Sequence, residues 1–298
     1  MKIVNIIGGL GNQLFQYAFA VALKAHNPEE EILIDTSHFH TLFFKKYKGR
    51  NLHYGYELDK ILGKVLIPVA TPRQLAHLTR YMPNYLISRF LRRYLPKRKT
   101  EYLEKADFLF DSEALSQKGS LYYEGYWQAA DYFSGIEEII KEAFRFKALD
   151  YENLKLVSKM QSSSSVSIHV RRGDYVTNAG FGGICDLGYY SRAIDYVLNH
   201  IDNPQFYIFS NDLKWCEENL IPLMKNNPHR LISHNKGSDS YKDMELMSYC
   251  HTNIIANSSF SWWGAFLNHN DKSLVICPTK WSNHCPNTDI YLKSWIKV

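Results

Sequence analysis

The residues best suited to chemistry lie within Ser167–Tyr175, where an apolar stretch ends in two adjacent arginines. His169 precedes the pair Arg171 and Arg172, and Asp174 follows it. The planar guanidinium matches two phosphate oxygens at once, so two arginines in succession favour a diphosphate or an anion of similar geometry. From these residues alone, a surface ion pair with Asp174 is an equally good interpretation.

The alternation of residues before the arginine pair predicts a β-strand. Val166, Ile168 and Val170 alternate with more polar residues, so a strand would bury these three side chains on one face. His169 and Arg171 would then project together from the opposite face. The glycine that follows the arginines ends the strand, and ligands of open α/β sheets bind beyond strand ends of this kind.

Strand and helix patterns alternate through the second half of the chain. The predicted strands are 166–170, 205–210, 230–234, 253–257 and 273–277, and the predicted helices are about 188–200, 213–225, 240–250 and 260–269. The first half opens similarly, with a strand at 3–7, a glycine-rich turn at 8–13, a helix at 14–25 and a strand at 31–35. Such alternation is typical of parallel, Rossmann-like sheets.

Two further polar clusters follow strands of the predicted second sheet. Ser210, Asn211 and Asp212 end one strand, and Asn257–Ser259 follows another. Because the carboxyl ends of parallel strands meet at one edge, we expect both clusters to lie near the arginine pair. The serines also open a helix, whose free N–H groups and dipole suit an anion; ordinary N-caps are the alternative interpretation.

Asp243 lies near the start of the predicted helix 240–250. The helix dipole favours a carboxylate there, so a purely structural role is one interpretation. A carboxylate can also accept two hydrogen bonds at once, from the N1–H and the 2-amino group of a guanine. We therefore treat Asp243 as a candidate for base recognition.

The glycine-rich turn near the N-terminus resembles part of a dinucleotide-binding fingerprint. Its candidate ligand-facing residues are Gly9, Gly11, Asn12 and Gln13. Asp35, at the end of the second strand, stands where an acidic ribose partner would be, but Leu14 replaces the third glycine. We expect the turn to let a sugar or an acceptor approach the backbone; an NAD-dependent oxidoreductase is an alternative.

Residues 89–99 combine basic and apolar side chains. The basic members are Arg89, Arg92, Arg93, Lys97, Arg98 and Lys99, and the apolar ones are Phe90, Leu91, Tyr94 and Leu95. A basic amphipathic stretch can make peripheral contact with an anionic membrane. A solvated helix face is the alternative interpretation.

Length and composition limit the class of protein. With 298 residues the chain is long enough for two subdomains, and the serine run 162–165 suggests a division into 1–161 and 162–298. A hydrophobic content of 45% is ordinary for a globular protein. A net charge of +5 is far below that expected of a nucleic-acid-binding protein, so we expect no nucleic-acid partner.

Other patterns bear on location and metals. No apolar run approaches the roughly 18 residues of a membrane span, and the first apolar run predicts a strand rather than a signal peptide. Five cysteines without a C-x-x-C pair fit reduced thiols. We therefore expect a cytoplasmic protein, with no structural zinc site.

Three motifs together carry a resemblance to a known family. They are Ile7–Ala18 (IGGLGNQLFQYA), His169–Tyr175 (HVRRGDY) and Ala256–Ala265 (ANSSFSWWGA). In order and spacing they resemble the bacterial α-1,2-fucosyltransferases of glycosyltransferase family 11, and the resemblance spans nearly the whole chain. It implies an α/β fold of GT-B type, with two Rossmann-like subdomains and a donor site at the cleft.

The resemblance also implies an activity. The donor would be GDP-β-L-fucose, a substrate rather than a cofactor, and the acceptor the 2-hydroxyl of a terminal galactose, either free or lipid-linked. The reaction would invert the donor to an α-1,2 linkage without a metal. The physiological setting would be O-antigen or capsule synthesis at the inner face of a bacterial inner membrane.

Similarity to the wider group of fucosyltransferases implies roles for individual residues. Arg171 would contact the β-phosphate, His169 would lie beside the donor, and Asp243 would hold the guanine. The turn Ser258–Phe260 would meet the ribose and phosphates. The full set of expected donor-binding residues is Arg172, Asn211, Asp212, Asp243, Asn257, Ser258, Ser259 and Phe260.

The general base is the least defined role. Inversion requires the acceptor hydroxyl to lose its proton as the bond to GDP breaks. Some related enzymes carry a glutamate in the glycine-rich turn, where this chain has Asn12 and Gln13. Asp174 is the first candidate, His169 the second, and a dissociative route with weak base assistance the third. A non-catalytic nucleotide-sugar or glycan-binding protein is the remaining alternative.

Overall fold

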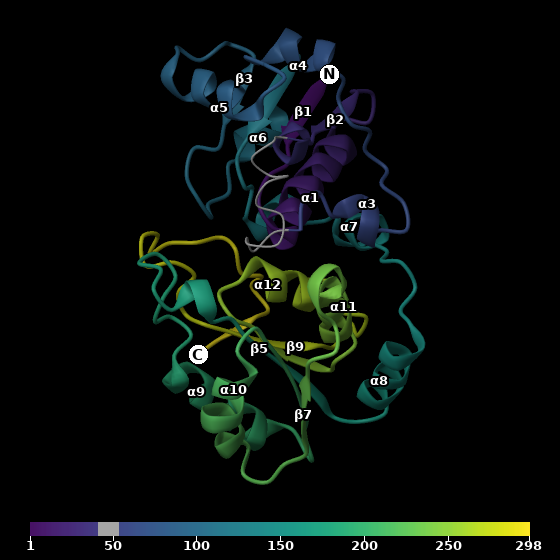
Figure 1. The fold of residues 1–298 in the computed structure, drawn as a ribbon, viewed down its shortest axis with the longest axis vertical. Helices are drawn as coiled ribbons and strands as arrows, with labels where there is room; N and C mark the ends of the chain where they lie inside the picture. The colour runs from purple at the N-terminus through teal and green to yellow at the C-terminus, as the bar shows by residue number, and fades with distance from the viewer. Residues whose placement is uncertain (41–53) are drawn as a thin grey trace. The chain divides into compact units, whose positions relative to one another are not determined.

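The computed structural model describes residues 1–40 and 54–298, which divide into two compact units (Figure 1). The first unit comprises Met1–Lys147 and Asn287–Ile290, and the second comprises Ala148–Pro286 and Tyr291–Val298. Helix α8 (Tyr151–Gln161) thus groups with the second unit, whereas we expected the division after it. The reason is packing: α8 contacts helix α11 (Tyr241–Ser248), and Asp150 pairs with Lys242 at 2.9 Å.

The first unit contains a four-stranded sheet. Its elements are β1 (Lys2–Asn5), α1 (Leu10–His26), β2 (Ile32–Asp35), η1 (Ser37–His40), α3 (Leu58–Ile61), α4 (Pro72–Leu78), α5 (Tyr85–Tyr94), β3 (Glu101–Leu103), α6 (Ser112–Ser116), β4 (Leu121–Glu124), η2 (Ala130–Phe133) and α7 (Glu137–Ala143). The strand order is β2-β1-β4-β3, and every pairing is parallel. The sheet therefore has its switch point between β1 and β4.

Helix α1 begins earlier than the sequence pattern predicted. Gly8, with φ of +80°, makes the sharp turn after β1, and Gly9 is an extended N-cap. Gly11 and the two residues after it consequently lie inside the first turn of α1, not in a loop. Helix α1 is buried along nearly its whole length, and this packing extends it to residues whose local pattern does not predict a helix.

The second unit contains a six-stranded sheet. Its remaining elements are β5 (Ser165–Val170), η3 (Gly173–Tyr175), α9 (Leu187–His200), β6 (Gln205–Ser210), α10 (Leu213–Trp215), η4 (Cys216–Leu220), η5 (Ile221–Met224), β7 (His229–Ile232), η6 (Gly237–Asp239), β8 (Thr252–Ile254), α12 (Ser259–Phe266), β9 (Leu274–Cys277) and β10 (Ile296–Lys297). All five pairings are parallel, in the order β10-β9-β8-β5-β6-β7. This order is that of the Rossmann fold, with its switch point between β5 and β8.

The alternation predicted for β5 is confirmed. Val166, Ile168 and Val170 belong to one apolar core with side chains of α9 and β6. The opposite face is also covered, since α11 and α12 lie on that side (Figure 1). Ser167 is buried there beside Asn253, whose amide donates to the serine hydroxyl at 2.7 Å.

The predicted helix 213–225 is broken into three short turns. A single turn of α10 is followed by the π-helical turn η4 and the 3₁₀ turn η5. Pro222 stands in the first turn of η5, where it supplies no N–H for a continuous helix. Apart from this helix, the predicted helices and strands of the second half form within a few residues of their expected limits.

Two findings concern the cysteines and the helices. All five cysteines are free thiols, as the absence of a paired spacing predicted. Within residues 1–40 and 54–298, no helix has both the length and the apolar character needed to cross a membrane.

Candidate functional site

The two adjacent arginines diverge beyond the end of β5. Arg171 pairs with Asp174, Nη2 to Oδ1 at 2.8 Å, and its guanidinium lies 5.3 Å from the centre of the Tyr175 ring. Arg172 turns toward β6, where its Nε pairs with Asp212 at 3.0 Å and its guanidinium lies over the Trp215 ring. The ion pair with Asp174, one of the two interpretations of this motif, therefore forms, but it uses only one nitrogen of the Arg171 guanidinium.

Two residues expected to bind a donor instead hold the loop after β5. Asn211 accepts a hydrogen bond from the Arg172 N–H at 2.8 Å and donates one to the Arg172 carbonyl at 3.2 Å. Asp212 pairs with the Arg172 side chain and caps α10 by accepting from the Trp215 N–H. These bonds fix the backbone from which Arg171 projects.

Gly173 is required for this loop, and we expect its replacement by alanine to destabilise the fold by about 2–3 kcal/mol. Its φ is +64°, and an added Cβ would lie 2.8 Å from the Asn211 amide nitrogen, which cannot move without breaking its bond to Arg172. Gly237 is the matched control, because its φ is +65° and nothing lies within 4 Å of an added Cβ.

Chemical denaturation of the two alanine variants separates the cost of backbone strain from the cost of the clash with Asn211. Gly237→Ala carries only the backbone strain, about 1–2 kcal/mol. Equal loss of unfolding free energy in both variants would contradict the role given to Asn211.

His169 lies next to the switch point of the second sheet. Its side chain is almost fully buried, its ring centre is 5.6 Å from that of Phe260, and its Nδ1 has no hydrogen-bond partner among the described residues. Burial, and secondarily the charge of Arg171, lower the pKa of His169 to about 3. The imidazole is therefore neutral at pH 7 and can exchange hydrogen bonds with a ligand, but it is a weak base.

The N-terminus of α12 completes this edge. The Ser258 hydroxyl does not cap the helix; it hydrogen-bonds the Tyr175 hydroxyl, whose pKa is raised by burial. The first turn of a helix has N–H groups without intrahelical partners, and with its dipole it attracts anions. Ser259 and Phe260 lie in this first turn. Tyr175 contacts both the Arg171 guanidinium and the Ser258 hydroxyl, so Arg171 and the N-terminus of α12 lie close together beside the β5/β8 switch point.

Asn257, by contrast, has a structural position. Its amide donates to the carbonyls of Phe181 and Trp281, and its N–H contacts the Cys185 sulfur at 3.3 Å. Asn283 reinforces the same junction by bonding the carbonyls of residues 179 and 182. Sequence reasoning missed these loop contacts, because neither loop has a periodic pattern that predicts its partner.

Asp243 belongs to a separate polar network at the start of α11. Asn235 donates to its carboxylate at 2.8 Å, and Asn235 and Asn153 exchange amide hydrogen bonds at 3.0 Å. Burial raises the pKa of Asp243 to about 7. Asn235, which the sequence pattern did not single out, fixes one oxygen of the carboxylate.

In the first unit, the glycine-rich motif is held by internal hydrogen bonds. Asn12 accepts from the Gln128 amide at 2.8 Å, next to the switch point of this sheet. Gln13 is fully buried and bonds the backbone at residues 8, 55 and 57, so it ties α1 to a loop and does not face a ligand.

Asp35, the acidic residue on which the oxidoreductase alternative depended, is buried and hydrogen-bonded within the fold. Asp35 is 1% exposed, and its oxygens accept from the Tyr122 hydroxyl and the Ser37 N–H. Gly9 and Gly11 also adopt conformations open to any residue, so the turn depends on Gly8 instead. Among the described residues no group of three His, Cys, Asp or Glu side chains is placed to hold a metal ion.

Two all-parallel sheets, the second with an arginine and a helix N-terminus at its switch point, define a class: Rossmann-like α/β proteins that bind an anionic ligand beyond the strand ends. The family model "Glycosyl transferase family 11" matches residues 2–298. The chain belongs to glycosyltransferase family 11. The resemblance to glycosyltransferase family 11 is confirmed, and so is an α/β fold with two Rossmann-like units.

Individual relatives agree with the family. The chain is 32% identical to an alpha-1,2-colitosyltransferase of Escherichia coli, over 99% of this chain and 98% of the relative. It is 30% identical to the O-antigen biosynthesis glycosyltransferase WbnK of Escherichia coli, over 98% of each. A shorter match, 34% identical over 37% of this chain and 32% of the relative, is to galactoside alpha-(1,2)-fucosyltransferase 2 of Rattus norvegicus.

Proposed function

We propose that this glycosyltransferase moves L-fucose from GDP-β-L-fucose to the 2-hydroxyl of a terminal galactose, with inversion to an α-1,2 linkage. The observation that carries the proposal is the convergence of Arg171 and the α12 N-terminus on the β5/β8 switch point. Residues of the second unit would bind the donor, and those of the first unit would bind the acceptor.

The chemistry needs positive charge at the leaving group. As the bond from fucose C1 to the β-phosphate oxygen breaks, negative charge develops on GDP. Arg171 would pair with the β-phosphate through the donors not used by Asp174, and the first N–H groups of α12 would bind the other phosphate oxygens. Because these groups supply the positive charge, we propose that the reaction needs no metal.

The acceptor hydroxyl attacks C1 and loses its proton to a base. Asp174 is our proposed base, and its ion pair with Arg171 would fix the orientation of the carboxylate. His169 is less suited to this role, since a pKa of about 3 makes its protonated form unfavourable. We assign His169 to a hydrogen bond with the donor through its free Nδ1.

We expect the affinity for GDP to rise about tenfold between about pH 6 and about pH 8. The pKa of Asp243 is raised to about 7, so the carboxyl is mostly protonated below that pH. Guanine N1–H and the 2-amino group require the ionised form, and binding therefore improves as pH rises through 7.

Calorimetric titration of GDP at several pH values tests this expectation. Asp243→Asn is the matched control: it should bind GDP weakly and respond less to pH, because only the phosphate titration remains. A wild-type pH response identical to that of the variant would remove Asp243 from base recognition.

A colitosyl donor is the second candidate, because the colitosyltransferase relative is aligned over 99% of this chain. The deciding experiment incubates the protein and EDTA with GDP-fucose, GDP-colitose or other nucleotide sugars, plus lactose, and determines the product linkage by NMR. An α-1,2-fucosylated product would support donor, linkage and metal independence together. Product formed only with GDP-colitose would make GDP-colitose the donor in place of GDP-fucose. GDP binding without any product would favour a non-catalytic role.

We extend the proposal to the cellular setting. The acceptor would be lipid-linked, as an O-antigen or capsule precursor, and the protein would act in the cytoplasm at the inner face of the bacterial membrane. The basic segment 89–99 supports this setting.

A further inference from the structure

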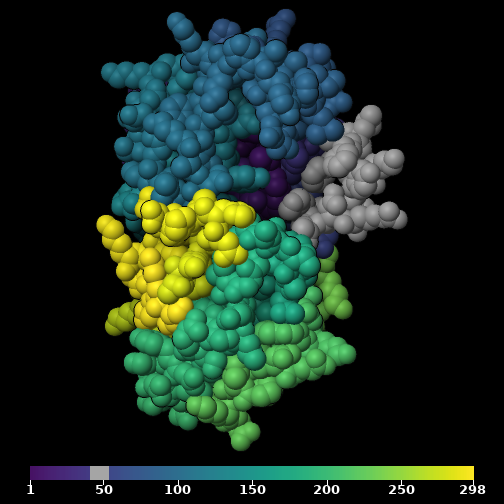
Figure 2. All heavy atoms as spheres, turned by 90° about the vertical axis from the view of Figure 1, so that its left-hand side faces the viewer, coloured from purple at the N-terminus to yellow at the C-terminus, as the bar shows by residue number. Residues whose placement is uncertain are grey.

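Charge is segregated along the chain. Residues 60–100 contain ten Lys and Arg and no Asp or Glu, whereas the rest of the chain has 25 Lys and Arg against all 30 Asp and Glu. The whole positive excess of the protein therefore comes from one stretch of the first unit, which contains α4 and α5. Figure 2 shows the blue surface to which this stretch contributes.

One face of α5 is anchored in the first unit. Tyr85, Ser88 and Arg92 are buried, and Arg92 pairs with Glu124 at 2.8 Å while lying over the Tyr85 and Tyr122 rings. Arg92 is thus a structural residue and not part of the exposed basic face that the sequence suggested. Its burial determines which side of α5 faces outward.

The outward face of α5 is apolar where a solvated helix would be polar. The exposed fractions are 44% for Leu86, 45% for Ile87, 59% for Phe90 and 66% for Tyr94. Leu86, Phe90 and Tyr94 are spaced four residues apart, and the Phe90 and Tyr94 rings are 4.7 Å apart. Met82 and Leu95 extend the exposed apolar residues beyond both ends of the helix. A contiguous exposed patch of this kind marks an interaction surface.

Exposed basic side chains flank the apolar face. Arg89 and Arg93 lie one turn apart beside it, and Lys97–Lys99 follows the helix. A second copy of the same surface would set these cations against each other, since residues 60–100 offer no carboxylate to pair with them. The complementary partner is a surface that combines anionic headgroups with an apolar layer.

We propose that α5 and Lys97–Lys99 form a docking surface for an anionic lipid bilayer. Leu86, Ile87, Phe90 and Tyr94 enter the interfacial layer, while Arg89, Arg93 and the lysines contact lipid phosphates. The surface deepens the proposed function by bringing the enzyme to a lipid-linked acceptor, but it uses none of the residues assigned to donor binding or transfer.

The test is co-sedimentation with vesicles made of equal parts phosphatidylglycerol and phosphatidylcholine, compared with vesicles of phosphatidylcholine alone. We expect the full chain to bind the anionic vesicles at least about tenfold more tightly, and less tightly as salt screens the charges. L86S/F90S and R89E/R93E should each lower anionic-vesicle binding about tenfold or more. Both pairs are exposed, so the fold should tolerate them.

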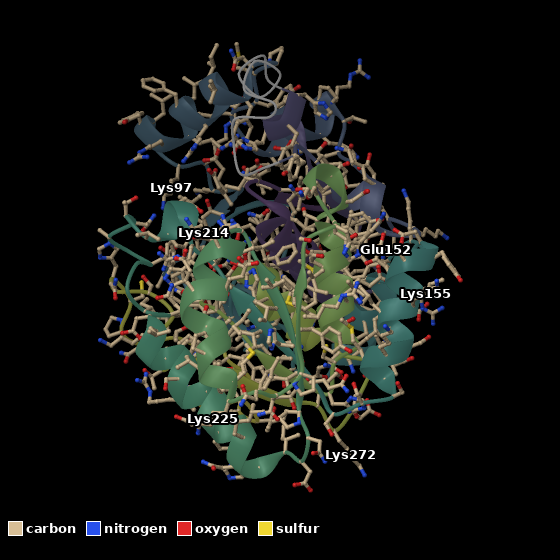
Figure 3. All side chains as sticks on the ribbon, turned by 60° about the horizontal axis from the view of Figure 1, so that its bottom comes forward. Lys97, Glu152, Lys155, Lys214, Lys225 and Lys272 are labelled. Atoms are coloured by element: carbon tan, nitrogen blue, oxygen red, sulfur yellow. The ribbon has the colours of Figure 1, made fainter. Side chains whose placement is uncertain are left out.

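The matched control is K155E/K272E, which makes the same charge change at exposed lysines of the second unit (Figure 3). It should leave vesicle binding within about twofold of the wild type. Equal loss in K155E/K272E and R89E/R93E would overturn the docking surface in favour of net charge. The docking surface would be overturned if the wild type bound neither kind of vesicle. It would also be overturned, in favour of a protein interface, if the wild type were a dimer that L86S/F90S made monomeric.

Turnover with a soluble acceptor separates this proposal from the proposed function. L86S/F90S and R89E/R93E should keep the wild-type rate with lactose while losing vesicle binding. If no donor yields product but anionic vesicles still bind through α5, the docking surface stands and the proposed function fails. If transfer occurs and the α5 variants bind vesicles as the wild type does, the docking surface fails alone.

Discussion

Replacing Arg171 by alanine is expected to lower the turnover rate of glycosyl transfer by about 10²- to 10³-fold, and to weaken GDP binding. The guanidinium stands at the β5/β8 switch point, with one side fixed by Asp174 and its face against Tyr175. The leaving diphosphate carries more negative charge in the transition state than in the bound donor, so the loss should be larger in turnover than in substrate binding. Steady-state kinetics with GDP-fucose and titration of GDP measure the two effects.

Two neighbouring variants make this prediction specific. Arg171→Lys keeps the charge but loses the two-point fork, so we expect it to recover only part of the rate. Arg172→Ala is the matched control, because that guanidinium is already held by Asp212 and Trp215. If Arg172→Ala lost as much turnover as Arg171→Ala with unchanged stability, the two roles would have to be exchanged.

Asp174→Asn is expected to keep GDP affinity and lose transfer by about 10²- to 10⁴-fold, the usual contribution of a general base. The amide keeps the size of the carboxylate and can still accept a hydrogen bond from Arg171, but it cannot take the acceptor proton. Single-turnover kinetics with pre-bound donor isolate this step from product release.

A merely positioning role for Asp174 gives a different pattern. Loss of the ion pair would disturb Arg171, and GDP affinity would then fall together with the rate. Full activity of Asp174→Asn would remove Asp174 as the base. If His169→Gln were then inactive, the second candidate would take its place; if it were active as well, the weakly assisted, dissociative route would be supported.

Much of the second unit could be predicted from its pattern. The alternation of Val166, Ile168 and Val170 requires one buried face, and parallel connectivity brings the ends of β5, β6 and β8 to the same edge. The positions of His169, Arg171 and the serine-led helix followed from these two local rules. The part of the first unit after β2 was harder, because β3 is only three residues long and α3, α4 and α6 are only four to seven residues long.

The fates of individual polar residues could not be predicted in this way. Arg171 and Arg172 are adjacent and identical, yet Arg171 projects at the switch point whereas Arg172 pairs with Asp212. The difference arises because Gly173 and Asn211 fix the backbone of the loop after β5. Arg92 belongs to a basic run but is buried against Glu124. Such outcomes depend on partners 30 or more residues away, which local spacing does not reveal.

The amino-acid sequence by itself determined the class of fold, the strand-end positions of the candidate site and membership of a family, because hydrophobic period and motif order are local properties. Only the tertiary structure decided which polar side chains remain for a ligand and which are satisfied by other residues. Gln13, Asp35 and Asn257 have motif-like positions but bond within the fold. Buried polar atoms require partners, and those partners come from distant segments that only folding brings together.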